Sequence, residues 1–172
     1  MKSISTKLTK TRILFILLTI SVMVMIFFFS SENSSDSSNT SGNVVRLILK
    51  AFVRNFDDFP TAKQLSMIKS AQHIVRKLAH FTIYAVLGFC VSFSFGKRKF
   101  LSRQTLESLM VGFLYAVSDE LHQSHVPGRS CEFKDVMIDT SGTMTGIFIS
   151  FVMIAVIHYL SKRVHKPKIE ER

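Results

Sequence analysis

The chain has 172 residues, of which 47% are hydrophobic and 20% charged, and its formal net charge is +10 at pH 7. A length of this order fits one domain, and the gathering of apolar residues into blocks excludes an ordinary soluble core. More than half of the 22 lysines and arginines lie in residues 1–12, 97–103 and 162–172, each beside an apolar block. Membrane topology explains this charge, so we expect no nucleic-acid partner.

The first predicted element is a membrane-spanning helix over residues 13–29, directly after the basic segment of residues 1–12. A secretory signal peptide is the alternative, because it too has a basic start and an apolar centre. The apolar block is longer than the ~7–15 residues of a signal peptide, and no Ala-x-Ala cleavage site follows it. We therefore expect a retained helix, since at ~1.5 Å per residue it almost crosses the ~30 Å hydrocarbon core.

Two external segments are predicted next. Residues 30–43 are rich in Ser, Asn, Asp and Gly, which predicts a flexible external linker. In residues 44–56, Arg46, Lys50 and Arg54 recur every four positions and form one basic stripe on an otherwise apolar helix. Such a helix either lies in the headgroup plane or packs on the rest of the chain, and the sequence leaves both interpretations open.

Three further spans complete the predicted fold. A polar-faced helix over residues 61–73 leads into an apolar span over residues 74–95. The next span begins at residue 101 or 105 and ends at 121, and the last covers residues 136–160. We therefore expect an all-α, polytopic membrane protein with four transmembrane helices plus an external amphipathic helix.

The distribution of charge predicts the orientation of these spans. The basic segments of residues 1–12, 97–103 and 161–172 fall on one side of a four-span bundle, whereas residues 119–135 carry more acids than bases. Because cytoplasmic loops are richer in Lys and Arg, both termini are expected in the cytoplasm. The loop at residues 119–135 then faces outward.

Ionisable side chains gather at the outer ends of the later spans, where their cost marks a functional site. Lys77, His80 and Tyr84 are three or four residues apart and share one helical face. Snorkelling at a helix end is a sufficient account of Arg76. For His80, a hydrogen-bonded core imidazole is the alternative to a functional role.

The third span ends in a second polar group. Asp119, His122 and Gln123 line one face, with Glu120 turned toward solvent. Arg129 follows a Pro-Gly turn, so its planar fork points back at an anionic ligand or at the carboxylates. An ion pair with Asp119, or with an acid at the start of the fourth span, is the alternative for this arginine.

The fourth span begins with two acids. Asp135 lies in the first turn, where the helix dipole favours an acid. Asp139 is about one turn deeper, so we expect it to be neutralised or to pair with a cation such as Lys77. Further along, Gly142 and Gly146 allow close helix contact, within the bundle or in a homodimer.

The combined set offers acid–base and ligand-binding chemistry. The candidate catalytic residues are His80, Asp119 and His122. The candidate ligand-binding residues are Lys77, Tyr84, Glu120, Gln123, Arg129, Asp135 and Asp139. Imidazole and carboxylate donors would suit zinc or another divalent ion, but no HExxH-like spacing connects them. We therefore expect no metal and no other cofactor.

The ordered combination of these motifs resembles the VanZ-like family. The matching pieces are Arg76-Lys77-Leu78-Ala79-His80-Phe81 with Tyr84 and Gly88, Ser118-Asp119-Glu120 with His122-Gln123, Pro127-Gly128-Arg129, Asp135-Val136, and the Gly142/Gly146 pair. The resemblance covers about residues 13–160 as one transmembrane domain, between the basic residues 1–12 and the basic tail at 161–172. At Asp139 it leads us to expect asparagine instead.

The resemblance implies a bacterial plasma-membrane protein that acts near the cell envelope and is associated with teicoplanin resistance. It implies no established reaction. From the residues we expect Lys77 and Arg129 to attract an anionic membrane lipid or a lipid-linked cell-wall precursor, while His80 and His122 donate hydrogen bonds or move protons. The alternatives are a membrane hydrolase or transferase with a His/Asp site, and a small transporter or scaffold.

Overall fold

The computed structural model describes residues 9–96, 102–129 and 131–164, and the described residues form helices and no strands. The elements, in chain order, are α1 (Lys10–Ser31), α2 (Ser34–Phe52), the short 3-10 helix η1 (Phe56–Asp58), α3 (Thr61–Ser94), α4 (Arg103–Gln123) and α5 (Phe133–Val164). The predicted all-α class is confirmed.

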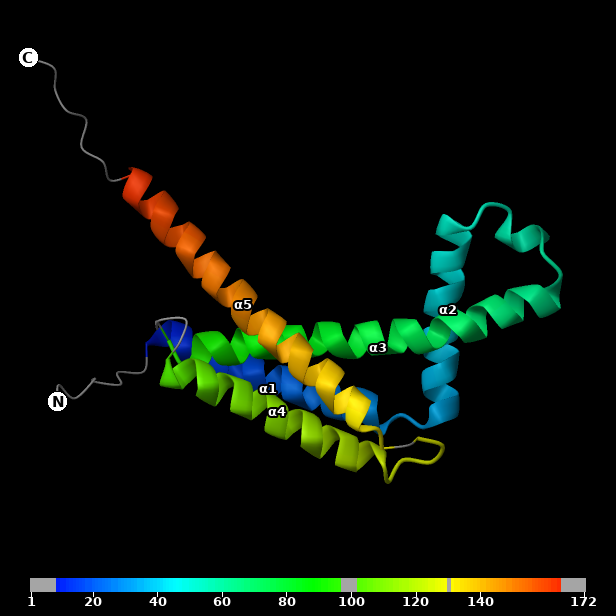
Figure 1. Ribbon diagram of the computed structural model, residues 1–172, viewed down its shortest axis with the longest axis horizontal. Coiled ribbons are helices and arrows are strands. Elements are labelled where there is room, and N and C mark those ends of the chain that lie inside the picture. Colours follow the sequence, from blue (N-terminus) through cyan, green and yellow to red (C-terminus); the bar gives the residue numbers. More distant parts are fainter. Residues whose placement is uncertain (1–8, 97–101, 130, 165–172) are drawn as a thin grey trace, which may run out of the picture.

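The helix α3 is the centre of the fold, because it packs on each of the other four α-helices and most extensively on α5. The chain runs to and fro, so α3 and α5 point in the same direction while α1 and α4 run opposite to them (Figure 1). At one end, Nε of Arg12 donates to the carbonyl of Ser94 at 2.9 Å. At the other end, α1 and α4 finish close to the start of α5 (Figure 1).

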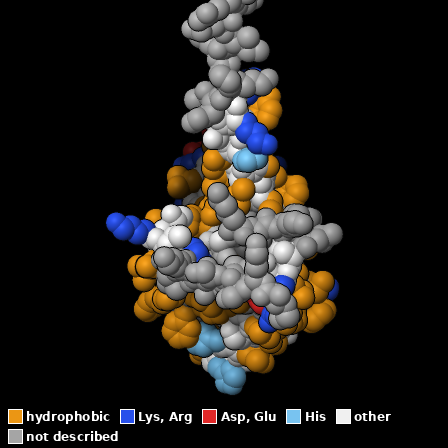
Figure 2. Space-filling model, turned by 90° about the vertical axis from the view of Figure 1, so that its left-hand side faces the viewer, with side chains coloured by type: hydrophobic (Ala, Val, Ile, Leu, Met, Phe, Trp, Pro, Cys, Tyr) orange, Lys and Arg blue, Asp and Glu red, His pale blue; other side chains and the backbone are white. Residues whose placement is uncertain are grey.

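Three of these helices are long and apolar enough to cross a membrane, namely α1, α3 and Phe133–Arg163 of α5. The predicted third span, α4, is not among them, because Glu107, Asp119, Glu120 and other polar side chains lower its hydropathy. Large apolar side chains remain exposed along the helices, and hydrophobic atoms cover much of the visible described surface in Figure 2. An apolar exterior of this kind is compatible with contact to lipid.

Two clusters of buried side chains hold the helices together. The larger one joins Val22 and Ile26 of α1 to Leu87 of α3, Ala116 of α4 and Val136 of α5. The smaller one packs α2 and η1 on the first half of α3 through Val45, Phe56 and Ile68. The first cluster positions the polar end of the bundle, and the second attaches α2 beside it.

The helices α3 and α5 approach closely along the glycines of α5. A Cβ atom at Gly142 would overlap the carbonyl oxygen of Phe81, and one at Gly146 would overlap that of Ala85. The small-residue stripe is therefore used within the chain, as small residues commonly are between membrane helices. Of the two alternatives, contact within the bundle is the one that the structure shows at these glycines, and a homodimer stays a prediction.

The prediction of a flexible linker at residues 30–43 is wrong, since α2 begins at Ser34 and most of the tract is helical. Nε2 of Gln72 on α3 donates to the carbonyl of Ser38 at 2.7 Å, and Ser41 is buried. These contacts come from a residue 34 positions further along the chain, so local composition gives no sign of them. Helices gain most of their stability from such tertiary packing rather than from propensity.

The amphipathic character of residues 44–56 is confirmed in part. Arg46 and Lys50 are exposed while Val45 is buried against α3, and the helix ends at Phe52. It therefore packs on the chain, and its place at a membrane surface stays a prediction. The predicted helix of residues 61–73 and the span after it form the single helix α3.

The basic segments that predict the orientation lie largely outside the described residues. Residues 1–8, 97–101 and 165–172 belong to this group. The cytoplasmic placement of both termini stays a prediction.

Candidate functional site

A cavity of about 420 Å³ lies at the end of the bundle where α1 finishes and α5 begins. Its walls come from α1, α2, α3, α4, α5 and the loop between α4 and α5. The predicted site residues that line it are Lys77, His80, Gln123, Arg129, Asp135 and Asp139. Residues far apart in the sequence therefore meet around one space, as the sequence predicted.

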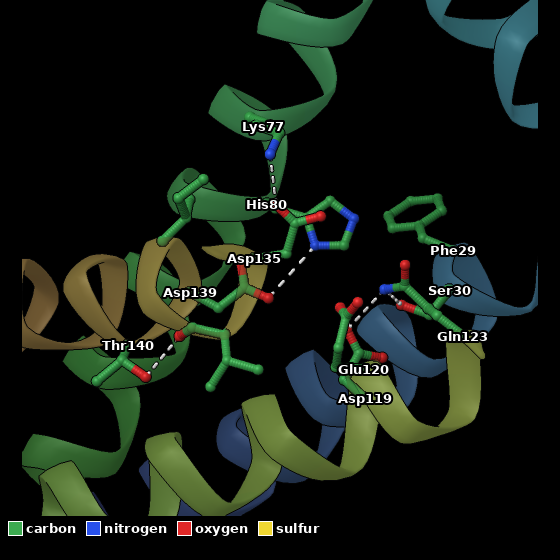
Figure 3. A network of polar contacts seen from close by, with 12 residues as sticks. Phe29, Ser30, Lys77, His80, Asp119, Glu120, Gln123, Asp135, Asp139 and Thr140 are labelled. Atoms are coloured by element: carbon green, nitrogen blue, oxygen red, sulfur yellow. Dashed lines mark hydrogen bonds and ion pairs between the residues drawn. The ribbon is translucent and has the colours of Figure 1, made fainter. Parts of the chain in front are cut away.

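An ion pair joins α3 to α5 beside this cavity. Nζ of Lys77 donates to Oδ1 of Asp135 at 2.6 Å, and Oε2 of Glu132 lies 3.9 Å from the same nitrogen (Figure 3). The predicted pairing of Lys77 with Asp139 is wrong. Because the two helices run in the same direction, Lys77 of α3 meets Asp135, the first acid of α5.

The next pair along the same two helices is His80 with Asp139. Nδ1 of His80 lies 3.5 Å from Oδ2 of Asp139, whose side chain is almost completely buried (Figure 3). Oδ1 of Asp139 is buried and has no hydrogen-bond partner. A buried carboxylate oxygen without a partner is costly, so this position calls for a further cation or proton.

A chain of hydrogen bonds connects Arg129 to Asp119 through Gln123. Nη1 of Arg129 donates to Oε1 of Gln123 at 2.9 Å, and Nε2 of Gln123 donates to Oδ2 of Asp119 at 3.1 Å. The same nitrogen also lies 3.3 Å from the hydroxyl of Ser30 on α1, as Figure 3 shows. The buried amide of Gln123 thus fixes both the arginine and the carboxylate.

Arg129 does not form the ion pair that was the alternative for it. Its Nη2 donates to the carbonyl of Phe29 at 3.4 Å, and no carboxylate of the described residues lies within ion-pair distance of it or of Arg76. Burial lowers the pKa of Arg129, and the charge of Arg76 lowers it further. Arginine stays protonated in proteins, so two cations that form no ion pair with a described residue face one cavity. Carboxylates also line this cavity, namely Glu32, Glu132, Asp135 and Asp139.

Three predicted site residues are buried but do not line the cavity. Tyr84, Asp119 and Glu120 are each at most 5% exposed. Glu120 was expected to face solvent, and the structure corrects this: its Oε1 accepts the backbone N–H of Glu132 at 2.6 Å. The loop after α4 folds back over the helix end, so Glu120 anchors the loop that carries Arg129.

The structure separates His122 from the other predicted catalytic residues. Its Nε2 lies 3.0 Å from the hydroxyl of Ser31, and its ring stacks on Phe27 with 4.7 Å between centroids. Three residues along a helix displace a side chain by about 60° around the axis, so His122 faces α1 while Asp119 faces inward. It connects α1 to α4 and does not line the cavity.

Sequence reasoning missed several polar residues of the cavity, namely Ser30, Glu32, His73, Arg76 and Glu132. Arg76 was ascribed to snorkelling, yet it lines the cavity together with Arg129. Ser30 was placed in the linker, yet it is the buried last turn of α1. The only signal for Arg76 was its place in the Arg76-Lys77 pair of the family motif, and no local signal marked Ser30.

One set of donors is compact enough for a metal ion. His80, Asp119 and Asp139 each offer a ligand atom, and these atoms lie within 4.8 Å of one another. Of the predicted catalytic residues, His80 and Asp119 belong to this set and His122 does not.

These features define a class, a small helical membrane protein with an ionisable cavity at one end of its bundle. A family model described as VanZ/LLP1 matches residues 15–155. The chain belongs to this family, as the sequence resemblance predicted. No curated protein and no solved structure matches the chain.

Proposed function

We propose that the cavity binds the phosphate-bearing headgroup of an anionic membrane lipid or of a lipid-linked cell-wall precursor. The observation that carries this proposal is the pair Arg76 and Arg129, which face the cavity and form no ion pair with a carboxylate of the described residues. A guanidinium offers a planar fork of donors that matches phosphate oxygens, and charge-assisted bonds of this kind are the strong ones. Nε of Arg129 is buried and has no partner, so the arginine has donor capacity to spare.

An apolar groove beside the cavity supports a lipid over a soluble anion. The groove is lined by Ile48, Val75, Leu78, Ala79, Thr82, Ile83 and Val86. Val75, Ala79 and Ile83 line both the groove and the cavity. A headgroup between the arginines would therefore place its acyl chain along the groove between α2 and α3. Sites of this kind combine an apolar wall with a few placed polar groups.

We place this site at the outer face of a bacterial plasma membrane. The charge distribution along the chain supports that orientation, because described cations of the basic segments, Arg12, Arg103 and Arg163, lie near the ends of α1, α4 and α5 that are away from the cavity. In this arrangement α4 also crosses the membrane, as the third span in chain order, and its Asp119 and Glu120 face the protein interior rather than lipid. A buried, partnered carboxylate is the usual form of an acid inside a membrane protein.

Membership of the VanZ/LLP1 family supports a link to teicoplanin tolerance. A protein that holds a lipid-linked wall precursor at the outer face changes how much of it a glycopeptide reaches. The test compares the teicoplanin concentration that inhibits cells producing wild-type protein or Arg129→Gln at equal membrane levels. We expect tolerance with the wild type alone, and equal inhibition of both strains would contradict the link.

The proposal itself is tested by the lipids that purify with the protein. The full chain is purified in mild detergent, and its bound lipids are extracted and identified by mass spectrometry. We expect anionic phospholipid or wall precursor to be enriched over the membrane average, and the masses distinguish these two sources. Arg76→Gln with Arg129→Gln should remove the enrichment, while Lys134→Gln, an exposed cation outside the cavity, should keep it. A bound-lipid composition equal to that of the whole membrane would contradict the proposal.

The second candidate function is a membrane hydrolase or transferase acting on the same phosphate-bearing lipid. The observation in its favour is His80, which lines the cavity beside the buried Asp139 as an acid–base pair would. Catalysis predicts that His80→Gln retains lipid binding and loses the cellular phenotype. If the protein only binds the lipid, His80→Gln should keep both lipid binding and the cellular phenotype.

A further inference from the structure

We propose that His80, Asp119 and Asp139 form a binding site for one divalent first-row transition metal ion, of which zinc and manganese are the fitting members. The three donors come from α3, α4 and α5, and their ligand atoms lie within 4.8 Å of one another. A metal ~2.1 Å from each donor would hold neighbouring donors about 3.4 Å apart in tetrahedral geometry. Nδ1 of His80 already lies 3.5 Å from Oδ2 of Asp139, so small side-chain rotations close the site.

The burial of the two carboxylates is the second, independent observation. Asp119 is 5% exposed and Asp139 is 2% exposed, and Oδ1 of Asp139 has no hydrogen-bond partner. Two buried carboxylates beside one imidazole hold more negative charge than a single histidine can neutralise. A dication between them would neutralise both acids and give the orphaned oxygen a ligand.

The surroundings of the donors are those of an oriented metal ligand. Nε2 of Gln123 donates to Oδ2 of Asp119 at 3.1 Å, and Arg129 holds the amide of Gln123 at 2.9 Å. Hydrogen-bonded partners of this kind fix the direction in which a ligating carboxylate points. Tyr84 is fully buried near both acids and its hydroxyl has no partner, so it is one more group directed at the same region.

The donor types select the class of metal. One imidazole nitrogen with two carboxylate oxygens suits zinc or manganese, whereas calcium and magnesium prefer oxygen alone and copper(I) prefers sulfur. Three protein ligands leave a coordination position open, as in catalytic rather than structural zinc sites. His80 and Asp139 line the cavity, so that open position faces it. The site does not depend on the lipid proposed above, since all three ligands belong to the chain.

The test uses the metal-free, full-length protein in detergent, with zinc and manganese ions added separately. Elemental analysis after equilibrium dialysis gives the stoichiometry, and calorimetry gives the affinity. We expect one ion of zinc or manganese per chain, with affinity at least 30-fold above that for magnesium. Asp139→Asn conserves the shape of the side chain and should lower the affinity at least 10-fold, whereas His125→Gln, an exposed histidine outside the cluster, should leave it unchanged.

X-ray absorption of the zinc-loaded wild-type protein keeps the proposal falsifiable if a variant does not fold. One imidazole with further oxygen ligands supports the site. A sulfur ligand, or more than one imidazole, would place the metal elsewhere and overturn it. Absence of zinc and manganese binding by the wild type would also overturn the proposal. Neither result bears on lipid binding by the arginines, which the lipid experiment measures separately.

Discussion

Nζ of Lys77 lies 2.6 Å from Oδ1 of Asp135, and this ion pair commits the lysine to a protein carboxylate. The two arginines of the cavity, Arg76 and Arg129, have no such partner among the described residues. In the proposed function the arginines therefore supply the positive charge that attracts the anion, while Lys77 joins α3 to α5. Lys77 was predicted to bind the ligand together with Arg129, and it is free to do so only when its ion pair with Asp135 is removed.

Removal of the acid from this pair should strengthen anion binding. In Asp135→Asn the ammonium of Lys77 loses its closest carboxylate and keeps only the longer contact with Glu132, so it becomes a third cation for a phosphate in the cavity. We expect the affinity for an anionic lipid to rise about threefold to tenfold, in line with ~1 kcal/mol for one added charge interaction. Lipid titration of the purified protein measures it. Asp135→Glu keeps the ion pair and is the control. A lower affinity in Asp135→Asn would mean that the anion site needs this ion pair to form.

Substitution of Gly146 should destabilise the bundle. In Gly146→Leu the new side chain has no room, because even its Cβ would overlap the carbonyl oxygen of Ala85. Overpacking costs about 1–3 kcal/mol, so we expect a fall of about 3–12 °C in the unfolding temperature in detergent. Met144 lies on the same helix and is 63% exposed, so Met144→Leu is the control. This variant should unfold at the wild-type temperature. An unchanged temperature in Gly146→Leu would mean that α3 and α5 do not pack as described.

The anchoring of the loop by Glu120 predicts a local effect. Glu120→Gln weakens the bond from the N–H of Glu132 to Oε1, which is 2.6 Å long. A hydrogen bond to a charged group contributes about 1.5–3 kcal/mol, so its loss should speed amide exchange at Glu132 about 10- to 100-fold. Hydrogen exchange with mass spectrometry measures this rate. Glu107→Gln removes a partly exposed acid of the same helix, paired with Arg103 far from the loop, and should leave the loop protected. Equal exchange in both variants would count against the anchor.

How far the sequence predicts this molecule depends on the range of the interactions concerned. Hydropathy found α1, α3 and α5, and three-to-four spacing correctly placed Lys77 and His80 on the face that meets the cavity. These are local signals. The partners of those two residues were not predictable in the same way, because they depend on α3 and α5 running in the same direction.

The remaining errors have the same physical origin. Glu120 and His122 lie at the end of α4, where Glu120 contacts the loop that follows and His122 contacts α1. The residue spacing within α4 gives no information about these contacts. Arg76 next to Lys77 looked like a second snorkelling cation, and only the assembled bundle shows that it shares a cavity with Arg129. The first turns of α2 looked disordered by composition, since their anchor is Gln72 on α3.

The proposed orientation is tested by the chain's own cysteines. Cys131 is exposed in the loop between α4 and α5, and Cys90 is buried in α3. If the loop faces outward, a membrane-impermeant maleimide should label intact cells at Cys131, since labelling requires an accessible thiol. Cys131→Ser should remove the signal. Labelling that appears only after the membrane is permeabilised would place the cavity on the cytoplasmic side.

The most direct measurement of the central claim is the affinity of the purified protein for phosphatidylglycerol compared with phosphatidylcholine of identical acyl chains. We predict that the wild type prefers the anionic lipid at least tenfold, and that Arg129→Gln weakens its binding about 10- to 100-fold, as expected for ~1.5–3 kcal/mol from a charge-assisted hydrogen bond. Lys134→Gln, an exposed cation that does not line the cavity, should change the affinity less than about twofold. Equal affinity for the two lipids, unaffected by Arg129→Gln, would contradict the account.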